Sequence, residues 1–304
     1  MNSLITVRDV NITVQGRAIR VARLEREKHE SVDSPEAFIE DLKAHRKRID
    51  LFTFVQHLPE TQPKYRFPLE WDNLAVLPVT TYEHWLRDQI RFAPRGRVRQ
   101  AEKKGVTVRE LPFNDDLVKG IWEVYNECPM RQGKLSRHYG KDLQTVRRDE
   151  GTFLDRSIFA GAFLGEQMIG FIKLVQNQAG TQVRLIEIAS MARYKDKCPA
   201  NALIAQAVRS CADRSIQFLI YEKFAYGKKR ADGLSQFKEV NGFQRVDIPR
   251  YYVPLTPIGL LALRATLHRT LADHLPVFLA DKIRELRGAW YSWRFRAVLE
   301  SPKS

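Results

Sequence analysis

The sequence lacks the features that mark membrane, secreted and zinc-binding proteins. It has no run of about 18 apolar residues, so no transmembrane helix is expected. The stretch 1–6 has neither the charged nor the apolar region of a signal peptide. Cysteine is scarce: Cys128, Cys198 and Cys211 show no metal-ligand spacing, and an odd number argues against a disulfide framework. A reducing cytoplasm is therefore the expected location, and no metal is expected.

Hydrolase-type catalytic constellations are also missing. The seven histidines are scattered, and no Ser/His/Asp arrangement has a persuasive spacing. There is no internal repeat and no low-complexity tract. The length of 304 residues fits one large domain or two small ones, and 44% apolar residues suffice for a sizeable core. The composition therefore predicts a globular protein.

What the sequence has in excess is positive charge. Its 50 Lys and Arg residues outnumber 36 Asp and Glu residues, which gives a net charge of +14. Residues 1–95 are nearly neutral, whereas residues 96–256 hold most of the excess. A basic surface indicates an anionic partner such as nucleic acid, a nucleotide-linked substrate or anionic lipid. The alternative is a well-solvated basic surface without a specific ligand.

The most regular pattern lies in residues 158–243. Two apolar runs, 158–164 and 168–175, flank a Gly-containing turn and predict a β-hairpin. The expected elements that follow are a strand at 183–191, a helix at 200–214 and a strand at 218–221. The order strand, strand, strand, helix, strand predicts a mixed α/β core of the α+β kind.

The segments before this core also show periodic patterns. We expect strands at 4–7, 10–14, 18–22 and 51–58, a helix that begins at Pro35, an irregular packed segment at 59–78, and a helix at 80–92 capped by Thr80 or Thr81. A basic helix then ends at Gly105. Its Arg95, Arg99 and Lys103 recur at i, i+4, so they form either an anion-binding face or a solvated one.

The remaining expected elements are a strand at 106–111, a helix at 115–128, a basic loop at 129–140 and a final strand at 246–255. Residues 258–271 and 277–298 predict two amphipathic helices, the second basic and rich in Trp. These helices either pack on the domain or lie on a membrane surface. The predicted division is an α/β region at 1–92, a central domain at 93–256 and a helical tail at 257–304.

Several of these segments resemble the GNAT acyltransferase superfamily. The resemblance rests on the hairpin with Gly165 and Gly170, on the strands and helix of 183–221, and on the closing phrase Asn241-Gly242-Phe243. The stretch 98–106 is similar to a motif of FemAB-like aminoacyltransferases, which build peptidoglycan cross-bridges from paired GNAT-like units. The resemblance covers about residues 85–255. It implies a mixed, mostly antiparallel sheet flanked by helices, in which two splayed parallel strands admit the acyl donor.

The resemblance also locates a donor site, at the N-terminus of the helix at 200–214. The candidate residues there are Lys195, Lys197, Ala200 and Asn201. This sequence departs from the superfamily's pyrophosphate loop, because Cys198 replaces a glycine and Pro199 has no N–H to donate. The donor is therefore either an acyl-CoA such as acetyl-CoA, with lysine charge in place of amides, or an aminoacyl-tRNA, as in the FemAB-like branch.

Acyl transfer to an amine needs a base, donors for the oxyanion and an acid. Glu187 lies in an apolar run, where burial would raise its pKa toward that of a useful base, and the resemblance places a base on this strand. The alternative is that strand alternation points Glu187 to a solvated face. The resemblance implies Tyr221 as the acid and Lys223 and Tyr226 as substrate contacts. Of Tyr251 and Tyr252, alternation sends one to the cleft, and Tyr252 is the candidate contact.

The loop at 129–140 supplies candidate contacts to the acceptor. They are Arg131, Gln132, His138 and Tyr139. A single histidine is also commonly structural, and the loop could be an ordinary surface turn.

Two classes of function remain open. The first is a transferase that moves an acyl or aminoacyl group to an amine of a cell-envelope or glycan precursor. The second is a non-catalytic GNAT-like module that binds nucleic acid or an anionic membrane surface. The expected partners are an anionic or glycan substrate, tRNA, and a membrane contact through 257–298 at the inner face. The sequence does not indicate an oligomeric state.

Overall fold

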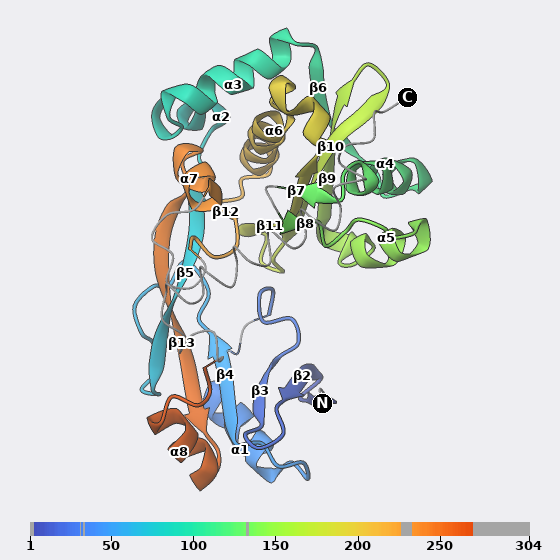
Figure 1. The fold of residues 1–304 in the computed structure, drawn as a ribbon. Coiled ribbons are helices and arrows are strands. Elements are labelled where there is room, and N and C mark those ends of the chain that lie inside the picture. Colours follow the sequence, from blue (N-terminus) through green and yellow to red (C-terminus); the bar gives the residue numbers. More distant parts are fainter. Residues whose placement is uncertain (1–2, 31, 33, 132–133, 226–232, 270–304) are drawn as a thin grey trace. The chain divides into compact units, whose positions relative to one another are not determined.

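The computed structural model describes residues 3–30, 32, 34–131, 134–225 and 233–269. The chain forms two compact units (Figure 1). Unit 1 contains 1–74, 225–228 and 245–275, and unit 2 contains 75–224, 229–244 and 276–304. Among the helices in these described ranges, none is long and apolar enough to cross a membrane.

Unit 1 is built from β-strands and two helices. Its strands follow the order β1-β2-β3-β4-β13-β5. The elements are β1 (Ser3–Val7), β2 (Val10–Gln15), β3 (Val21–Leu24), α1 (Pro35–Ala44), β4 (Leu51–Val55), β5 (Leu69–Pro78), β13 (Gln244–Pro254) and α8 (Pro257–Arg264). Aromatic side chains fill its core, where Phe54 stacks on Tyr251 with ring centroids 5.0 Å apart and on Phe52 at 5.5 Å.

Unit 2 contains the end of β5 and five further strands in the order β5-β12-β11-β10-β9-β6. They are β6 (Val106–Leu111), β9 (Ser157–Leu164), β10 (Gln167–Gln176), β11 (Gln182–Ser190) and β12 (Phe218–Ile220), with a two-stranded β7 (Met130–Arg131) and β8 (Lys134–Leu135) apart from them. Neighbouring strands are antiparallel except β11 and β12, which are parallel. The mixed, mostly antiparallel α/β fold expected from the sequence is confirmed.

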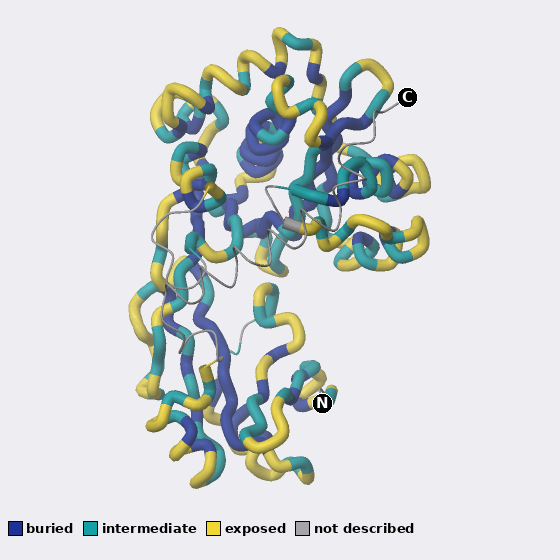
Figure 2. The backbone as a smooth tube through the Cα atoms, in the orientation of Figure 1, coloured by how far each residue is buried: buried dark blue, intermediate teal, exposed yellow. Residues whose placement is uncertain are grey.

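Helices cover both faces of these strands. They are α2 (Tyr82–His84), η1 (Trp85–Gln89), α3 (Phe92–Lys103), α4 (Asp115–Asn126), α5 (Leu143–Glu150), η2 (Leu154–Arg156), η3 (Ala192–Lys197), α6 (Pro199–Asp213) and α7 (Gly233–Val240). Helix α6 packs on one face of β9, β10 and β11, and α4 packs on the other face (Figure 1). Helix α6 is buried along most of its length, whereas α3 is largely exposed (Figure 2).

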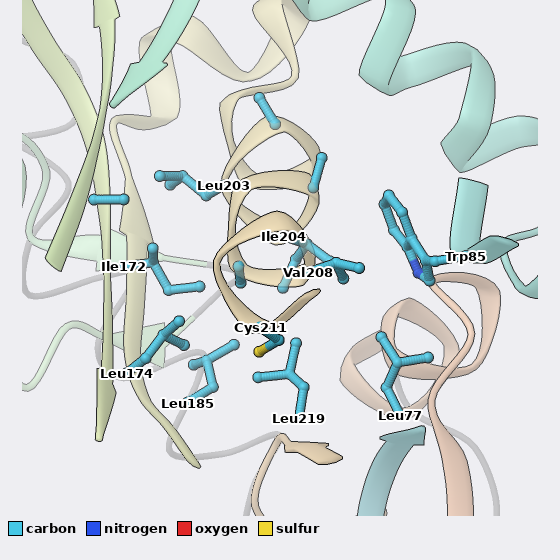
Figure 3. Packing of buried hydrophobic residues seen from close by; sticks show 14 of the residues in the cluster. Leu77, Trp85, Ile172, Leu174, Leu185, Leu203, Ile204, Val208, Cys211 and Leu219 are labelled. Carbon is cyan, nitrogen blue, oxygen red and sulfur yellow. The ribbon is translucent and has the colours of Figure 1, made fainter. Parts of the chain in front are cut away.

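The largest core of unit 2 lies between α6 and the sheet. Leu203 of α6 points toward Ile172 of the sheet, whereas Ile204 and Val208 lie on the side of the helix nearer Trp85 (Figure 3). Trp85 also belongs to this core, and its indole N–H donates to the carbonyl of Asn241 at 2.9 Å. Burying a large apolar side chain contributes roughly 1.5–3 kcal/mol. This packing fixes β11 from one side.

Three stretches differ from the expectation. The segment 59–78 is irregular only in its first part, because Leu69–Pro78 forms β5 and pairs with β12. The helix expected at 80–92 is present in part: Thr81 caps α2, as expected, by accepting from the His84 N–H at 3.1 Å, the π-helix η1 follows, and α3 begins at Phe92. Helix α5 was not predicted. The Asp142 side chain caps it by accepting from the backbone N–H of Thr145 at 2.6 Å.

The C-terminal tail is described only in part. Helix α8 ends at Arg264, which is earlier than the expected helix at 258–271. Thr256 caps it by accepting from the backbone N–H of Gly259 at 3.1 Å. The helix expected at 277–298 lies outside the described residues.

Candidate active site

The parallel strands β11 and β12 separate soon after they meet. They pair only from Gln182–Arg184 to Phe218–Ile220, whereas β11 continues to Ser190. On its other edge, β11 stays paired with β10 as far as Ser190. In the described chain, no strand pairs with 185–190 on the edge that faces β12. The chain after β12 stays bonded to β5, where the Tyr221 N–H donates to the Ala75 carbonyl at 2.8 Å, so the two strands diverge as the resemblance implies, and Glu187 lies beyond their last pair.

Glu187 is held by two side chains of the loop between β8 and α5. The guanidinium Nη2 of Arg137 donates to Glu187 Oε2 at 2.5 Å. The Nε2 atom of His138 lies 3.4 Å from the same oxygen. The side chains of Glu187 and His138 are only 16% and 13% exposed, whereas that of Arg137 is 75% exposed. The structure thus brings together two predicted site residues, Glu187 and His138.

The pKa of Glu187 differs from the sequence expectation. Burial raises the pKa of this carboxyl, but hydrogen bonds and charge from His138 and Arg137 outweigh burial and hold it below its ordinary 4.5. The predicted rise of the pKa was therefore wrong. Its cause is the loop residues Arg137 and His138, which lie about 50 positions earlier in the chain and could not be paired with Glu187 from local pattern.

The pH dependence of stability follows from this pKa. Because the folded-state pKa lies below the unfolded value, near 4.5, the pairing of Glu187 stabilises the fold above that pH. This contribution is lost as the pH falls through the folded-state pKa. We expect the stability advantage of the wild type over Glu187→Gln to shrink below pH 4.5. Urea denaturation between about pH 3 and pH 7 measures it, and an advantage that stays constant over this range would contradict the prediction.

His138 is oriented by a ring stack and by the loop's attachment to α4. Its ring stacks on that of Tyr125 with centroids 4.1 Å apart and planes at 12°. Two side chains of α4 bind the loop. The indole N–H of Trp122 donates to the carbonyl of Lys141 at 2.9 Å, and the Asn126 amide oxygen accepts from the Gly140 N–H at 2.7 Å. These contacts fix the imidazole beside the open edge of β11.

Both ring nitrogens of His138 face cationic donors. The Nδ1 atom lies 3.1 Å from Lys141 Nζ, and the Nε2 atom accepts from Arg137 Nε at 2.7 Å. A neutral imidazole has one lone pair to offer, so it satisfies only one of them. Lys141 has another partner, since its Nζ donates to Asp149 Oδ2 at 2.8 Å. The ring can therefore present Nε2 as an acceptor without leaving Lys141 unpaired.

A second layer of buried polar groups, which the sequence did not predict, lies beneath His138. The Tyr125 hydroxyl donates to Glu150 Oε1 at 2.7 Å. Lys173 Nζ donates to the Glu150 carbonyl at 2.6 Å and to Thr152 Oγ1 at 3.0 Å. Lys173 is also the cross-strand partner of Glu187. The sequence did contain a signal for this layer: Lys173 is a charged residue inside the apolar run of β10, just as Glu187 is inside the run of β11.

Burial dominates the ionisation of this second layer. It raises the pKa of the Glu150 carboxyl and of the Tyr125 hydroxyl, and it lowers the pKa of the Lys173 ammonium. Lys173 is almost fully buried, and its Nζ lies 3.8 Å from Glu150 Oε2. These groups lie beneath Tyr125 and His138 and hold the two rings in place. They are not positioned to contact a substrate.

The N-terminus of α6 holds the four predicted donor-site residues, but it does not form a phosphate cradle. Cys198 has a left-handed backbone with φ of 57°, and Pro199 begins the helix without an N–H group. The Asn201 N–H already donates to the Cys198 carbonyl at 3.1 Å, and its side-chain amide donates to Asn241 Oδ1 at 3.3 Å. Of this first turn, only the Ala200 N–H has no partner in the described chain.

Asp196 neutralises part of the positive charge that this turn could offer to a pyrophosphate. Asp196 lies in η3, directly before α6, where its carboxylate meets Lys197 Nζ at 3.3 Å and Lys104 Nζ at 3.4 Å. Lys195 is exposed, and among the described residues no ion pair to it is present. A phosphate site needs several free N–H groups and positive charge. The residues present therefore do not fit the pyrophosphate of coenzyme A.

The predicted acceptor contacts Arg131 and Tyr139 lie at different depths. Arg131 donates to the backbone carbonyls of Ser190, at 2.8 Å, and of Val124, so it braces β11 against α4. Tyr139 is exposed on the loop surface. Gln132 and Tyr226 lie outside the described residues.

The other predicted residues belong to different surroundings. The ring of Tyr221 packs against Phe243 at 5.8 Å, with Lys238 Nζ 4.7 Å from its centroid. The backbone carbonyl of Lys223 accepts from the same Lys238 ammonium. Tyr252 belongs to unit 1, where its ring lies 4.6 Å from His268 and burial raises its pKa to about 12.

Metal ligation has no support in these surroundings. In the ranges that the structure describes, no group of three or more His, Cys, Asp and Glu side chains could hold a metal ion.

No protein-family model matches the sequence, and no curated protein matches it. Solved structures do resemble it. FemX aligns with a TM-score of 0.59 at 11% identity, over 86% of this chain and 90% of FemX. L-PGS from Bacillus licheniformis gives a TM-score of 0.57 at 13% identity, over 87% and 88% of the two chains. The C-terminal domain of a candidate lysylphosphatidylglycerol synthetase from Agrobacterium fabrum gives 0.55 at 12% identity, over 88% of both chains.

Identities this low establish the fold alone. The splayed strands β11 and β12, the helix α6 between them and the similarity to FemX agree with one another. The chain therefore has the fold of the GNAT superfamily in its FemAB-like form.

Proposed function

We propose that this protein transfers an acyl or aminoacyl group to an amine, with Glu187 and His138 at the reaction centre. One observation carries the proposal: the largely buried Glu187 carboxylate and His138 imidazole lie 3.4 Å apart, beside the stretch of β11 that is no longer paired with β12. The resemblance to GNAT acyltransferases implies that the acyl donor enters between β11 and β12, beside this edge. The proposal keeps Glu187 as a catalytic residue and adds His138 as its partner.

The two side chains have different roles: Glu187 binds the ammonium, and His138 takes its proton. An amine arrives at neutral pH as an ammonium and must lose a proton before it can attack a carbonyl carbon. The pKa of Glu187 is held low, so its carboxylate is charged and binds the ammonium instead of deprotonating it. His138 Nε2 takes this proton, the free amine attacks the carbonyl carbon of the donor, and the imidazolium gives a proton to the leaving group as its bond to that carbon breaks. The imidazolium that forms lies beside the Glu187 carboxylate, and their attraction stabilises it in a poorly solvated site.

An aminoacyl-tRNA is the donor that these residues favour. The first turn of α6 offers one free N–H and an adjacent carboxylate, which suits coenzyme A poorly. The exposed face of α3 carries Arg97, Arg99 and Lys103, which can neutralise phosphates of a polynucleotide. A neighbour in fold bears the name of a lysylphosphatidylglycerol synthetase, which supports an aminoacyl group and a membrane-associated acceptor. The proposed acceptor is an amine of a cell-envelope or glycan precursor at the inner face of the membrane.

A paired donor screen tests this function. Calorimetry with acetyl-CoA is expected to show no binding, whereas filter binding of aminoacyl-tRNA is expected to be retained at low salt and lost at high salt. Incubation with radiolabelled aminoacyl-tRNA and a membrane extract should yield a labelled amide. Tight binding of acetyl-CoA would overturn the donor assignment. Binding of tRNA without any labelled product would favour a non-catalytic module.

A further inference from the structure

We propose that Arg137 occupies the binding position of a substrate's primary ammonium group. That ammonium displaces the Arg137 guanidinium and donates to the same two acceptors, His138 Nε2 and Glu187 Oε2. The inference rests on the proposed function, since it concerns the same two side chains, and it adds the chemical class of the ligand and the group that competes with it.

The geometry of Arg137 is that of a bound cation. Its Nε donates to His138 Nε2 at 2.7 Å, while its Nη2 donates to Glu187 Oε2 at 2.5 Å. The two acceptors lie 3.4 Å apart, so one cationic group reaches both of them. A primary ammonium has three N–H donors around one nitrogen and can satisfy the same pair. A neutral amide or a hydroxyl supplies no charge to the Glu187 carboxylate.

The two acceptors are more deeply buried than Arg137, and this difference favours replacement of Arg137 by a ligand ammonium. The acceptors are 13% and 16% exposed, whereas Arg137 is 75% exposed. Leaving a buried carboxylate without a donor is costly, so a departing Arg137 must be replaced by another cation. Arg137 itself loses little on leaving, because it is 75% exposed and water solvates the freed guanidinium.

Competition from Lys141 for the His138 imidazole further weakens the binding of Arg137. Lys141 Nζ approaches Nδ1 at 3.1 Å, so two cationic donors compete for the one lone pair of a neutral ring. Whenever Lys141 takes that lone pair, Arg137 keeps only its bond to Glu187. A ligand ammonium competes with a contact that is already partly unsatisfied.

Two ligands carry the required chemistry, the α-ammonium of a transferred aminoacyl group and the ammonium of the acceptor. Small probes separate them. Alaninamide has an ammonium next to a carbonyl, as the donor does, and ethylamine has an ammonium alone, as a simple acceptor does. Propionamide has the shape of alaninamide without the ammonium. Ligand-observed NMR titrations of these three probes with the full chain at neutral pH report binding without any transfer reaction.

The expected result is binding of at least one amine and no measurable binding of propionamide. Arg137→Ala should tighten amine binding roughly two- to fivefold, the factor that matches the loss of an exposed ion pair. Glu187→Gln should weaken it about tenfold or more, because a charge-assisted hydrogen bond is lost. Arg87→Ala is the matched control, since Arg87 is 79% exposed and paired with Asp88 at 3.1 Å, and it should change nothing.

Preference for alaninamide assigns the position to the donor, and preference for ethylamine assigns it to the acceptor. The proposal is overturned if neither amine binds, if propionamide binds equally well, or if Arg137→Ala behaves like Arg87→Ala. Amine binding that depends on Arg137 in a protein without transfer activity would reject the proposed function and keep this inference. Transfer activity with no such dependence would do the reverse.

Discussion

Replacing His138 by Gln is expected to lower the rate of aminoacyl transfer by about 10²–10⁴-fold, the usual contribution of a positioned general base. Gln cannot accept the amine's proton, although it can occupy similar space beside Tyr125. Glu187→Gln should cause a loss of similar size, because it removes both the charge that binds the ammonium and the charge that stabilises the imidazolium. Initial rates with labelled aminoacyl-tRNA measure both effects.

The two variants should differ in which kinetic constant changes. Glu187→Gln is expected to raise KM for the amine and to lower kcat, whereas His138→Gln should act mainly on kcat. Glu166→Gln is the matched control, since Glu166 is exposed on the turn between β9 and β10 and should leave the rate unchanged. A His138→Gln protein that folds normally and retains more than about a tenth of the rate would refute the role of His138 as the base.

Local patterns predicted the parts of the fold whose partners are close in sequence. The hairpin of β9 and β10 was predicted because its two apolar runs flank Gly165, which adopts φ of 58°. Helix α6 was predicted from its apolar stripe. Strand β5 was not, because its pairing partner β12 lies about 140 positions later and the prolines before it indicate irregular structure. Helix α5 was missed because only Val146 and Glu150 of its residues are buried, so it shows little apolar periodicity.

In the site, too, local signals were predictable from the sequence and contacts between distant segments were not. Glu187 stood out because a carboxylate interrupts an apolar strand, and that signal is local. Its ionisation was predicted in the wrong direction, since Arg137 and His138 reach it from a loop that only the folded chain brings near. Lys173 carried the same local signal as Glu187, yet its partner Glu150 lies on the helix that the sequence did not reveal. Isolated charges in apolar strands are therefore better considered together than singly.

Removal of the Lys173 ammonium is expected to destabilise the fold more than any other change in this site. Lys173→Met should lower the free energy of unfolding by about 3–5 kcal/mol, because it leaves the buried Glu150 carboxylate without its counter-charge. It also leaves the Glu150 carbonyl and Thr152 Oγ1 without the donor that Lys173 provides. Urea denaturation measures the loss. Lys103→Met, on the exposed face of α3, is the control and should stay within about 0.5 kcal/mol of the wild type.

The double variant Lys173→Met with Glu150→Gln tests the cause of this loss. Removing both charges should recover part of the stability, since no unpaired buried charge remains, and the Gln carbonyl can still accept from the Tyr125 hydroxyl. Recovery should be incomplete because the two other acceptors of Lys173 stay unpaired. Burial pushes both partners toward their neutral forms, so a neutral pair is the competing explanation. In that case Lys173→Met alone would cost only the lost hydrogen bonds, and adding Glu150→Gln would recover nothing.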